Sequence, residues 1–255
     1  MRVVVADSAA EVGRRVAEIV GERAPAVMGV STGSSPMPAY AEIVDRRLLP
    51  QTAHLCLLDE YVGLSSSHPQ RYRSVIRRAL ADPLGIPPEH VHAPDVDADD
   101  LEAAADEYEQ LLADLGGVDL QLLGIGRNGH IGFNEPGTPF ASPTHVASLD
   151  ETTRRDNSRF FPGVDDVPHT VITQGPATIR RARSIVLIAT GDAKRAAMGR
   201  LLSGTVSVEI PATSLHDHPD LTVIGDRAAL DHLDAPDHLD APDHLDTNDQ
   251  QENRP

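Results

Sequence analysis

Residues 27–49 read VMGVSTGSSPMPAYAEIVDRRLL, an apolar run followed by a polar loop and a helical pattern. The same alternation recurs along the chain. Apolar, β-branched runs predict strands at Val3–Ala6, Val27–Val30, His54–Leu58, Leu120–Ile125, Ile185–Ala189 and Leu221–Ile224. Because these runs are almost continuously apolar, they are typical of a parallel sheet that is covered on both faces.

Helical patterns fill the intervals between the runs. Ser8 and Glu11 form a capping box that opens a helix ending near Arg23. Further helices are predicted at Pro38–Leu49, Pro69–Ala81, Asp99–Leu115 and Asp192–Leu202. This alternation predicts the α/β class, with a doubly wound, mostly parallel sheet and helices on both faces. Ligands of such sheets bind beyond the carboxyl ends of the strands, so the loops that follow the strands are the candidate site.

The last 25 residues differ in composition from the rest of the chain. Residues 231–255 repeat Asp-His-Leu-Asp-Ala-Pro and contain eight acids and one arginine, a net charge of −7. Since the whole chain carries −17, residues 1–230 carry −10. The repeat has little apolar surface to bury, which predicts a disordered acidic tail at 231–255 after a single domain at 1–230.

Composition excludes several classes of partner. The net charge of −17 and the eight aromatic residues argue against a nucleic-acid partner. A run of eighteen apolar residues is absent, so we expect no membrane span. The single cysteine, Cys56, and the acidic residue that interrupts the N-terminal apolar run at Asp7 favour a cytoplasmic protein.

The loop after the second predicted strand, Ser31-Thr-Gly-Ser-Ser-Pro36, has the composition of a phosphate-binding loop. Small residues allow backbone N–H groups to approach a phosphate, and the N-terminus of the next helix adds partial positive charge. A polar turn with an N-cap serine explains the same residues, and a Walker lysine is absent.

Two adjacent acids, Asp59 and Glu60, follow the third predicted strand. Carboxylates at a strand end are candidates for general acid–base chemistry, although a helix cap or a solvated strand end is the alternative. Neighbouring residues of an extended strand point to opposite sides. We therefore favour Asp59 as the acid that faces the site.

The loop after the fourth predicted strand, residues 124–137, reads GIGRNGHIGFNEPG. It begins like a dinucleotide fingerprint, but the later glycines and prolines forbid the helix that such a fingerprint needs. We interpret it as a glycine-supported loop that presents Asn128, His130 and Glu135. Histidine transfers protons near neutral pH, and a carboxylate nearby fixes its tautomer.

Two basic residues, Arg159 and Lys194, complete the candidate set. Lys194 is the one lysine beside 21 arginines and stands where a helix is predicted to begin. A cation there opposes the helix dipole, and a bound anion relieves that conflict. The pairs His90–His92 and His216–His218 have no third ligand at a recognisable spacing, so we expect no metal.

Four segments together resemble the glucosamine-6-phosphate deaminase family: STGSSP at 31–36, LDEYVGL at 58–64, the loop 124–137 and TRRDNSRFF at 153–161. The resemblance extends in order over residues 1–230. It implies a Rossmann-like α/β fold, no cofactor, and an enzyme of the hydrolase or isomerase-deaminase type in amino-sugar and N-acetylglucosamine catabolism. Its substrate is glucosamine 6-phosphate, and its products are fructose 6-phosphate and ammonia.

The resemblance also implies roles for individual residues. His130 opens the sugar ring, Asp59 moves a proton between C2 and C1, and Glu135 and Asn128 orient His130. The phosphate lies among Thr32, Gly33, Ser34, Ser35, Arg159 and Lys194.

The sequence also bears on allosteric regulation and leaves two alternative functions open. Regulated members of the family place basic side chains after the Asn-Glu-Pro segment, whereas this chain has His145 and Ala147, so we expect no allosteric site for N-acetylglucosamine 6-phosphate. A related 6-phosphogluconolactonase and a non-catalytic sugar-phosphate sensor are the alternative functions. The oligomeric state, the direction of flux and the preference at C4 of the sugar are not predicted.

Overall fold

The structure, a computed structural model, describes residues 1–230. The predicted acidic, disordered tail comprises residues 231–255, which lie outside the described residues. The predicted end of the domain at residue 230 coincides with the limit of the described part. Within residues 1–230, none of the helices is both long and apolar enough to cross a bilayer.

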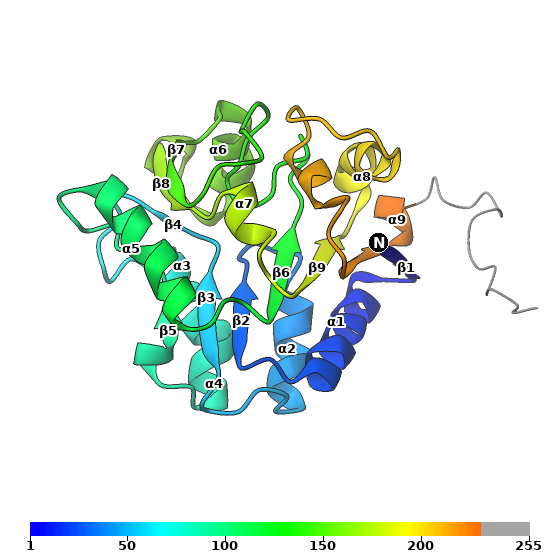
Figure 1. Cartoon of the computed structure of the whole chain (residues 1–255), viewed down its shortest axis with the longest axis horizontal. Helices are drawn as coiled ribbons and strands as arrows, with labels where there is room; N and C mark the ends of the chain where they lie inside the picture. Colours follow the sequence, from blue (N-terminus) through cyan, green and yellow to red (C-terminus); the bar gives the residue numbers. More distant parts are fainter. Residues whose placement is uncertain (231–255) are drawn as a thin grey trace, which may run out of the picture.

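A parallel sheet of seven strands forms the centre of the described residues (Figure 1). Its strand order is β1-β10-β9-β6-β2-β3-β5, and each neighbouring pair is parallel. The strands are β1 (Arg2–Ala6), β2 (Val27–Val30), β3 (His54–Leu57), β5 (Val91–His92), β6 (Leu120–Gly124), β9 (Ser184–Ala189) and β10 (Leu221–Asp226). The α/β class and the parallel sheet predicted from the sequence are confirmed.

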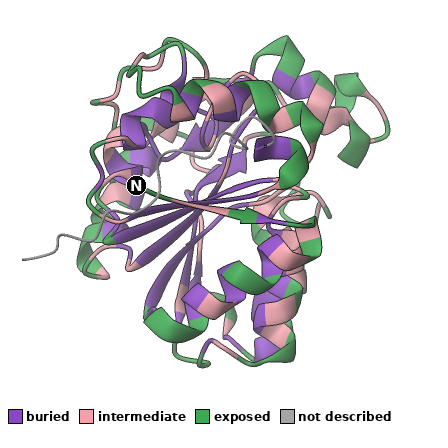
Figure 2. Cartoon of the chain, turned by 90° about the vertical axis from the view of Figure 1, so that its right-hand side faces the viewer, coloured by how far each residue is buried: buried purple, intermediate pink, exposed green. Residues whose placement is uncertain are grey.

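Helices cover both faces of this sheet, and each face has its own apolar core (Figure 2). On one face pack α1 (Ala9–Arg23), α2 (Met37–Asp45), α3 (Tyr72–Ile76), the π-helical turn η1 (Arg77–Ala81) and α4 (Asp82–Leu84). On the other face pack α5 (Leu101–Asp114), α7 (Pro176–Ile179), α8 (Arg195–Leu202), the 3-10 turn η6 (Pro211–Leu215) and α9 (Arg227–Leu230). Central strands such as β9 are buried along their whole length, as the continuous apolar runs indicate.

Local sequence signals explain several helix ends. Ser8 is the N-cap of α1 and its hydroxyl accepts a hydrogen bond from the Glu11 N–H at 3.2 Å. The predicted helix at 38–49 ends earlier, at Asp45, because Arg47 adopts a left-handed conformation. The predicted helix at 69–81 begins only at Tyr72, and its second half is π-helical.

A second, antiparallel sheet stands beside the main one and was not predicted. It contains β4 (Asp59–Tyr61), β8 (Thr170–Thr173) and β7 (His145–Ser148), in that order. Only Leu58 separates β3 from β4, so the chain passes directly from the main sheet into the second one. This passage places Asp59 at the corner between the two sheets.

Short helical segments complete the chain. They are η2 (Pro88–His90), α6 (Glu151–Asn157), η3 (Ser158–Phe160), η4 (Val164–Asp166) and η5 (Asp192–Lys194). The segment from α6 to η4 connects β7 with β8 and packs against the second sheet through Phe161 and Val167. In Figure 1, α6 lies beside β7 and β8, beyond the carboxyl ends of β2 and β6.

Candidate active site

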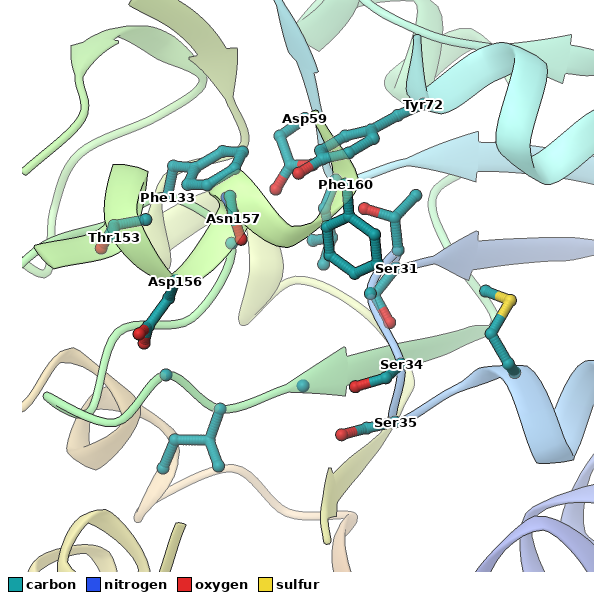
Figure 3. Close-up of a pocket in the computed structure, with 18 of the residues that line it drawn as sticks. Ser31, Ser34, Ser35, Asp59, Tyr72, Phe133, Thr153, Asp156, Asn157 and Phe160 are labelled. Carbon is teal, nitrogen blue, oxygen red and sulfur yellow. The ribbon is translucent and has the colours of Figure 1, made fainter. Parts of the chain in front are cut away.

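A cavity of about 900 Å³ opens at the carboxyl ends of β2, β6 and β9. Its size is typical of a small-molecule site, and its position is the one that the ligand rule for open α/β sheets predicts. It brings together predicted residues from five separate segments of the chain: Thr32, Gly33, Ser34, Ser35, Asp59, His130, Arg159 and Lys194. In Figure 3 the Asp59 carboxyl points into the cavity, and Ser34 and Ser35 lie on another wall.

Asp59 is the buried acid of this cavity. Its side chain lies at the start of β4 with 7% of the residue exposed. Burial, and in second place the charge of Glu60, raise the pKa of Asp59 to about 8. Such a carboxyl is protonated below about pH 8, and the carboxylate that forms as the pH rises is a stronger base than an ordinary aspartate.

Glu60 points away from the cavity and caps a helix. Its carboxylate accepts hydrogen bonds from the backbone N–H groups of Tyr61, Tyr72 and Arg73, each at 2.9 Å. Two of these donors belong to the first turn of α3, so the negative charge lies at the positive end of that helix. The sequence left two roles open for the adjacent acids, an acid–base group and a helix cap. Each role applies to a different residue: Glu60 is the helix cap, whereas Asp59 faces the cavity.

His130 sits on the glycine-rich loop that follows β6, and no helix follows this loop until α6. Gly126 lies directly under the imidazole, because a Cβ added there would stand 2.3 Å from the His130 ring. Gly132 has a φ of +56° and would bring a Cβ to 3.6 Å from Asp59 Oδ2. Glycine at these two positions lets the loop approach both the histidine and the buried acid.

Glu135 and Asn128 lie behind His130, away from the cavity. Glu135 Oε2 accepts a hydrogen bond from Asn128 Nδ2 at 2.6 Å and lies 3.4 Å from His130 Nδ1. The second distance is that of an ion pair and not of a formed hydrogen bond, and such contacts commonly tighten when substrate binds. A donor at Nδ1 leaves Nε2 as the ring nitrogen that can exchange a proton.

Glu135 remains ionised although it is largely buried. Burial raises its pKa, but contacts with His130, Thr153 and Asn128 outweigh burial and lower the pKa below its usual value. Thr153 is a residue that the sequence did not indicate; its hydroxyl donates to Glu135 Oε1 at 2.5 Å.

Positive charge gathers at the other end of the cavity. Lys194 and Arg159 line it together with Arg127, which pairs with Asp156 at 3.4 Å. Burial lowers the pKa of Lys194; Asp156 raises it in part, and the two arginines lower it further. The serine-rich loop lies at this end too, since Ser35 Oγ is 3.2 Å from Thr190 Oγ1, four residues before Lys194. An anion bound here would stabilise all three cations.

Aromatic rings form the wall next to Asp59. Tyr61, Tyr72 and Phe133 pack with ring centroids 4.7–6.1 Å apart, and Phe161 meets Tyr61 edge-on. The Tyr61 hydroxyl accepts hydrogen bonds from Tyr72 at 3.0 Å and from Asn157 at 2.9 Å. Tyr72 and Asn157 line the cavity (Figure 3), yet no spacing in the sequence distinguished them.

The histidine pairs have structural roles. His216 and His218 each donate to a backbone carbonyl, at 2.6 and 2.9 Å. His92 Nε2 and His54 Nδ1 share a hydrogen bond of 2.9 Å, and His90 stacks on His54. Among the described residues, no three His, Cys, Asp or Glu side chains are arranged to hold a metal ion.

Comparison with known proteins places the whole arrangement in context. The profile of the family of glucosamine-6-phosphate isomerases and 6-phosphogluconolactonases matches residues 2–223. A glucosamine-6-phosphate deaminase of Pseudarthrobacter chlorophenolicus is 49% identical over 240 residues, which are 91% of this chain and 93% of the relative. The deaminase of Geobacillus sp. (strain WCH70) is 44% identical over 238 residues, 90% of this chain and 95% of the relative.

Among solved structures, a deaminase resembles this chain more closely than a lactonase does. A monomeric glucosamine-6-phosphate deaminase is 40% identical and superposes with a TM-score of 0.88, over 91% of this chain and 99% of that one. The 6-phosphogluconolactonase of Trypanosoma cruzi has a TM-score of 0.75 and 22% identity, over 91% of this chain and 97% of that one. At that identity the lactonase shows a shared fold and nothing finer.

Proposed function

The chain belongs to the family of glucosamine-6-phosphate isomerases and 6-phosphogluconolactonases, and from this premise we propose that it is a glucosamine-6-phosphate deaminase. It converts glucosamine 6-phosphate and water into fructose 6-phosphate and ammonia. One observation of the site carries the proposal: a buried carboxyl with a raised pKa, Asp59, shares one cavity with a cationic end and with His130, which Glu135 contacts from behind.

Each part of this cavity matches a need of the reaction. The cationic end, with the loop 32–35, binds the dianionic phosphate and fixes the sugar at its far end. The His130–Glu135 pair moves a proton at the ring oxygen and opens the pyranose to the aldehyde. Asn128 donates a hydrogen bond to Glu135 and so keeps its carboxylate oriented toward His130.

The isomerisation then falls to Asp59. In its ionised form Asp59 removes the proton from C2 of the open chain, which gives an enolamine, and returns that proton to C1. The resulting C2 imine reacts with water, which supplies the ketone oxygen and releases ammonia. The apolar surroundings raise the basicity of the carboxylate, which abstraction of a carbon-bound proton requires.

The reaction class follows from these steps. Water enters only to release ammonia after the hydrogen has moved from C2 to C1, so the enzyme is a deaminating isomerase and the label hydrolase is too loose. A lactonase needs a base for water but no proton transfer between two carbons. The relatives called deaminases share 40–49% identity with this chain, whereas the solved lactonases share 17–22%.

Two further expectations, on the oligomeric state and on the cellular compartment, extend the proposal. The solved relative is named monomeric, and we expect this chain to act as a monomer too. We also expect it in the cytoplasm, where its phosphorylated substrate is confined.

The decisive experiment measures ammonia and fructose 6-phosphate together, with glucosamine 6-phosphate as substrate. We expect both products in equal amounts and a loss of about 10²–10⁴-fold in kcat for Asp59→Asn. Asp106→Asn, on the exposed side of α5, is the matched control and keeps full activity. Tight binding of the substrate without either product identifies a sensor instead. Turnover of 6-phosphogluconolactone alone identifies the lactonase.

A further inference from the structure

Thr153 touches the proton-transfer pair from a different part of the chain. It lies in α6, is 4% exposed and borders the cavity. Its hydroxyl donates to Glu135 Oε1 at 2.5 Å, eighteen residues away in sequence. Figure 3 shows Thr153 and Asn157 on this helix, on the side of the cavity where Phe133 lies.

The two oxygens of Glu135 have different partners. Oε2 faces Asn128 and His130, both on the loop that also carries Glu135. Oε1 accepts a hydrogen bond from Thr153, its one hydrogen-bond donor among the described residues. Without that donor the buried Oε1 is left unsatisfied, and an unsatisfied carboxylate oxygen favours protonation of the acid.

No charged side chain of α6 takes the place of Thr153. Arg154 donates to the carbonyl groups of Val164 and Val167. Arg155 pairs with Glu151, and Asp156 pairs with Arg127. His130 is thus the one ionisable group among these that faces Glu135, and a neutral hydroxyl supplies the contact from α6.

We propose that Thr153 is a positioning residue for the reaction: it holds Glu135 ionised and aimed at His130, and it fixes α6 to the proton-transfer pair. This role rests on the proposed function only through the part given to His130. The hydrogen bond to Oε1 leaves Oε2 directed at the imidazole. If Glu135 is protonated or rotates, it no longer orients Nδ1, and ring opening slows.

Thr153→Val removes the hydroxyl and keeps the branched shape, whereas Thr153→Ser keeps the donor. Thr152→Val changes the exposed neighbour in the same helix and is the matched control. The first measurement is the titration of the Glu135 carboxyl carbon by NMR in protein labelled at glutamate side chains, with Glu135→Gln to assign the signal. The second is the pH profile of kcat/KM on its acid side.

We expect Thr153→Val to raise the pKa of Glu135 by about one unit, because a hydrogen bond to a charged group contributes about that much. The acid limb of the profile moves to higher pH by the same amount, since Glu135 must be ionised for activity. Thr153→Ser and Thr152→Val leave both measurements unchanged.

An unchanged Glu135 titration in Thr153→Val overturns the proposal, even if activity falls, because a purely structural defect lowers activity without moving that pKa. If Thr153→Val does not fold, Thr153→Ala gives the same measurement with less apolar surface. If no variant and not even the parent chain turns over glucosamine 6-phosphate, the proposed function has failed, whereas the NMR titration still decides the role of Thr153.

Discussion

Two carboxyl groups of the site, Asp59 and Glu135, have environments that move their pKa values apart. Burial raises the pKa of Asp59 to about 8, and neighbouring donors hold that of Glu135 below its usual value. Asp59 is positioned to accept and return a proton, whereas Glu135 is positioned to stay charged beside His130. Such a separation assigns acid–base and orienting roles within one cavity.

The raised pKa of Asp59 has a consequence for stability. Its folded pKa of about 8 lies above its unfolded value of 3.8. Between these values the folded state binds the extra proton, so Asp59 lowers stability progressively as the pH rises from about 4 to 8. Asp59→Asn should therefore raise the Tm at pH 8 by much more than at pH 5, because most of the window between the two pKa values lies above pH 5. A rise of about 2–4 °C is expected per kcal/mol of relief.

Thermal unfolding of Asp59→Asn and the parent chain at both pH values checks this prediction, with Asp106→Asn as the control. An equal rise at pH 5 and pH 8 shows that packing, and not the charge of Asp59, is responsible. Such an Asp59→Asn variant, more stable but inactive, also fits the general cost of a buried functional group.

At the scale of elements, long apolar runs were predictable and short polar pairings were not. β2 was predicted with its observed limits, and five further strands within one or two residues. β4 is only Asp-Glu-Tyr and pairs with Thr170–Thr173, more than a hundred residues away, so nothing local marks it. β5 is two residues long and gives no periodicity to read.

The same limit applies to the site. Residues at the ends of predictable strands, such as Asp59, Ser35 and His130, were found because the ligand rule for parallel sheets points to them. Tyr72 and Thr153 enter the site through contacts between the second sheet, α3 and α6. Since that sheet was not predicted, the sequence alone could not indicate that these two residues lie at the cavity. Lys194 was found by its rarity; it ends the turn η5 and is the N-cap residue of α8.

Glu60 joins β4 to α3, and this junction is testable. Its carboxylate is fully buried and accepts three backbone N–H bonds. Glu60→Gln replaces one acceptor oxygen with an NH₂ group that opposes these donors, so we expect a loss of about 1–3 kcal/mol in the free energy of unfolding. Urea denaturation measures the loss. Glu102→Gln, in the exposed first turn of α5, is the control for an uncapped charge change. A Glu60→Gln variant as stable as the parent chain shows that the cap is dispensable.

At the scale of the whole molecule, the chain is acidic but concentrates cations in one place. Its net charge is −17, yet Arg127, Arg159 and Lys194 gather at one end of the cavity. An overall negative field repels phosphate esters, so binding depends on local cations that face the ligand. A second site for a sugar phosphate would need a second cluster of this kind.

The segment after the Asn-Glu-Pro loop supplies no such cluster. His145 Nδ1 donates to the Pro143 carbonyl at 2.8 Å, and Ala147 packs against the aromatic core of the second sheet. Because Nδ1 of His145 is engaged in this way and Ala147 carries no charge, these two positions offer no group of basic side chains to a phosphate. We therefore predict hyperbolic initial rates with glucosamine 6-phosphate, a Hill coefficient of about 1, and no activation by N-acetylglucosamine 6-phosphate. Initial rates measured with and without that ester over a wide range of substrate test this prediction. Sigmoidal curves that become hyperbolic when the ester is added would show that a regulatory anion site exists elsewhere in the chain or between copies of it.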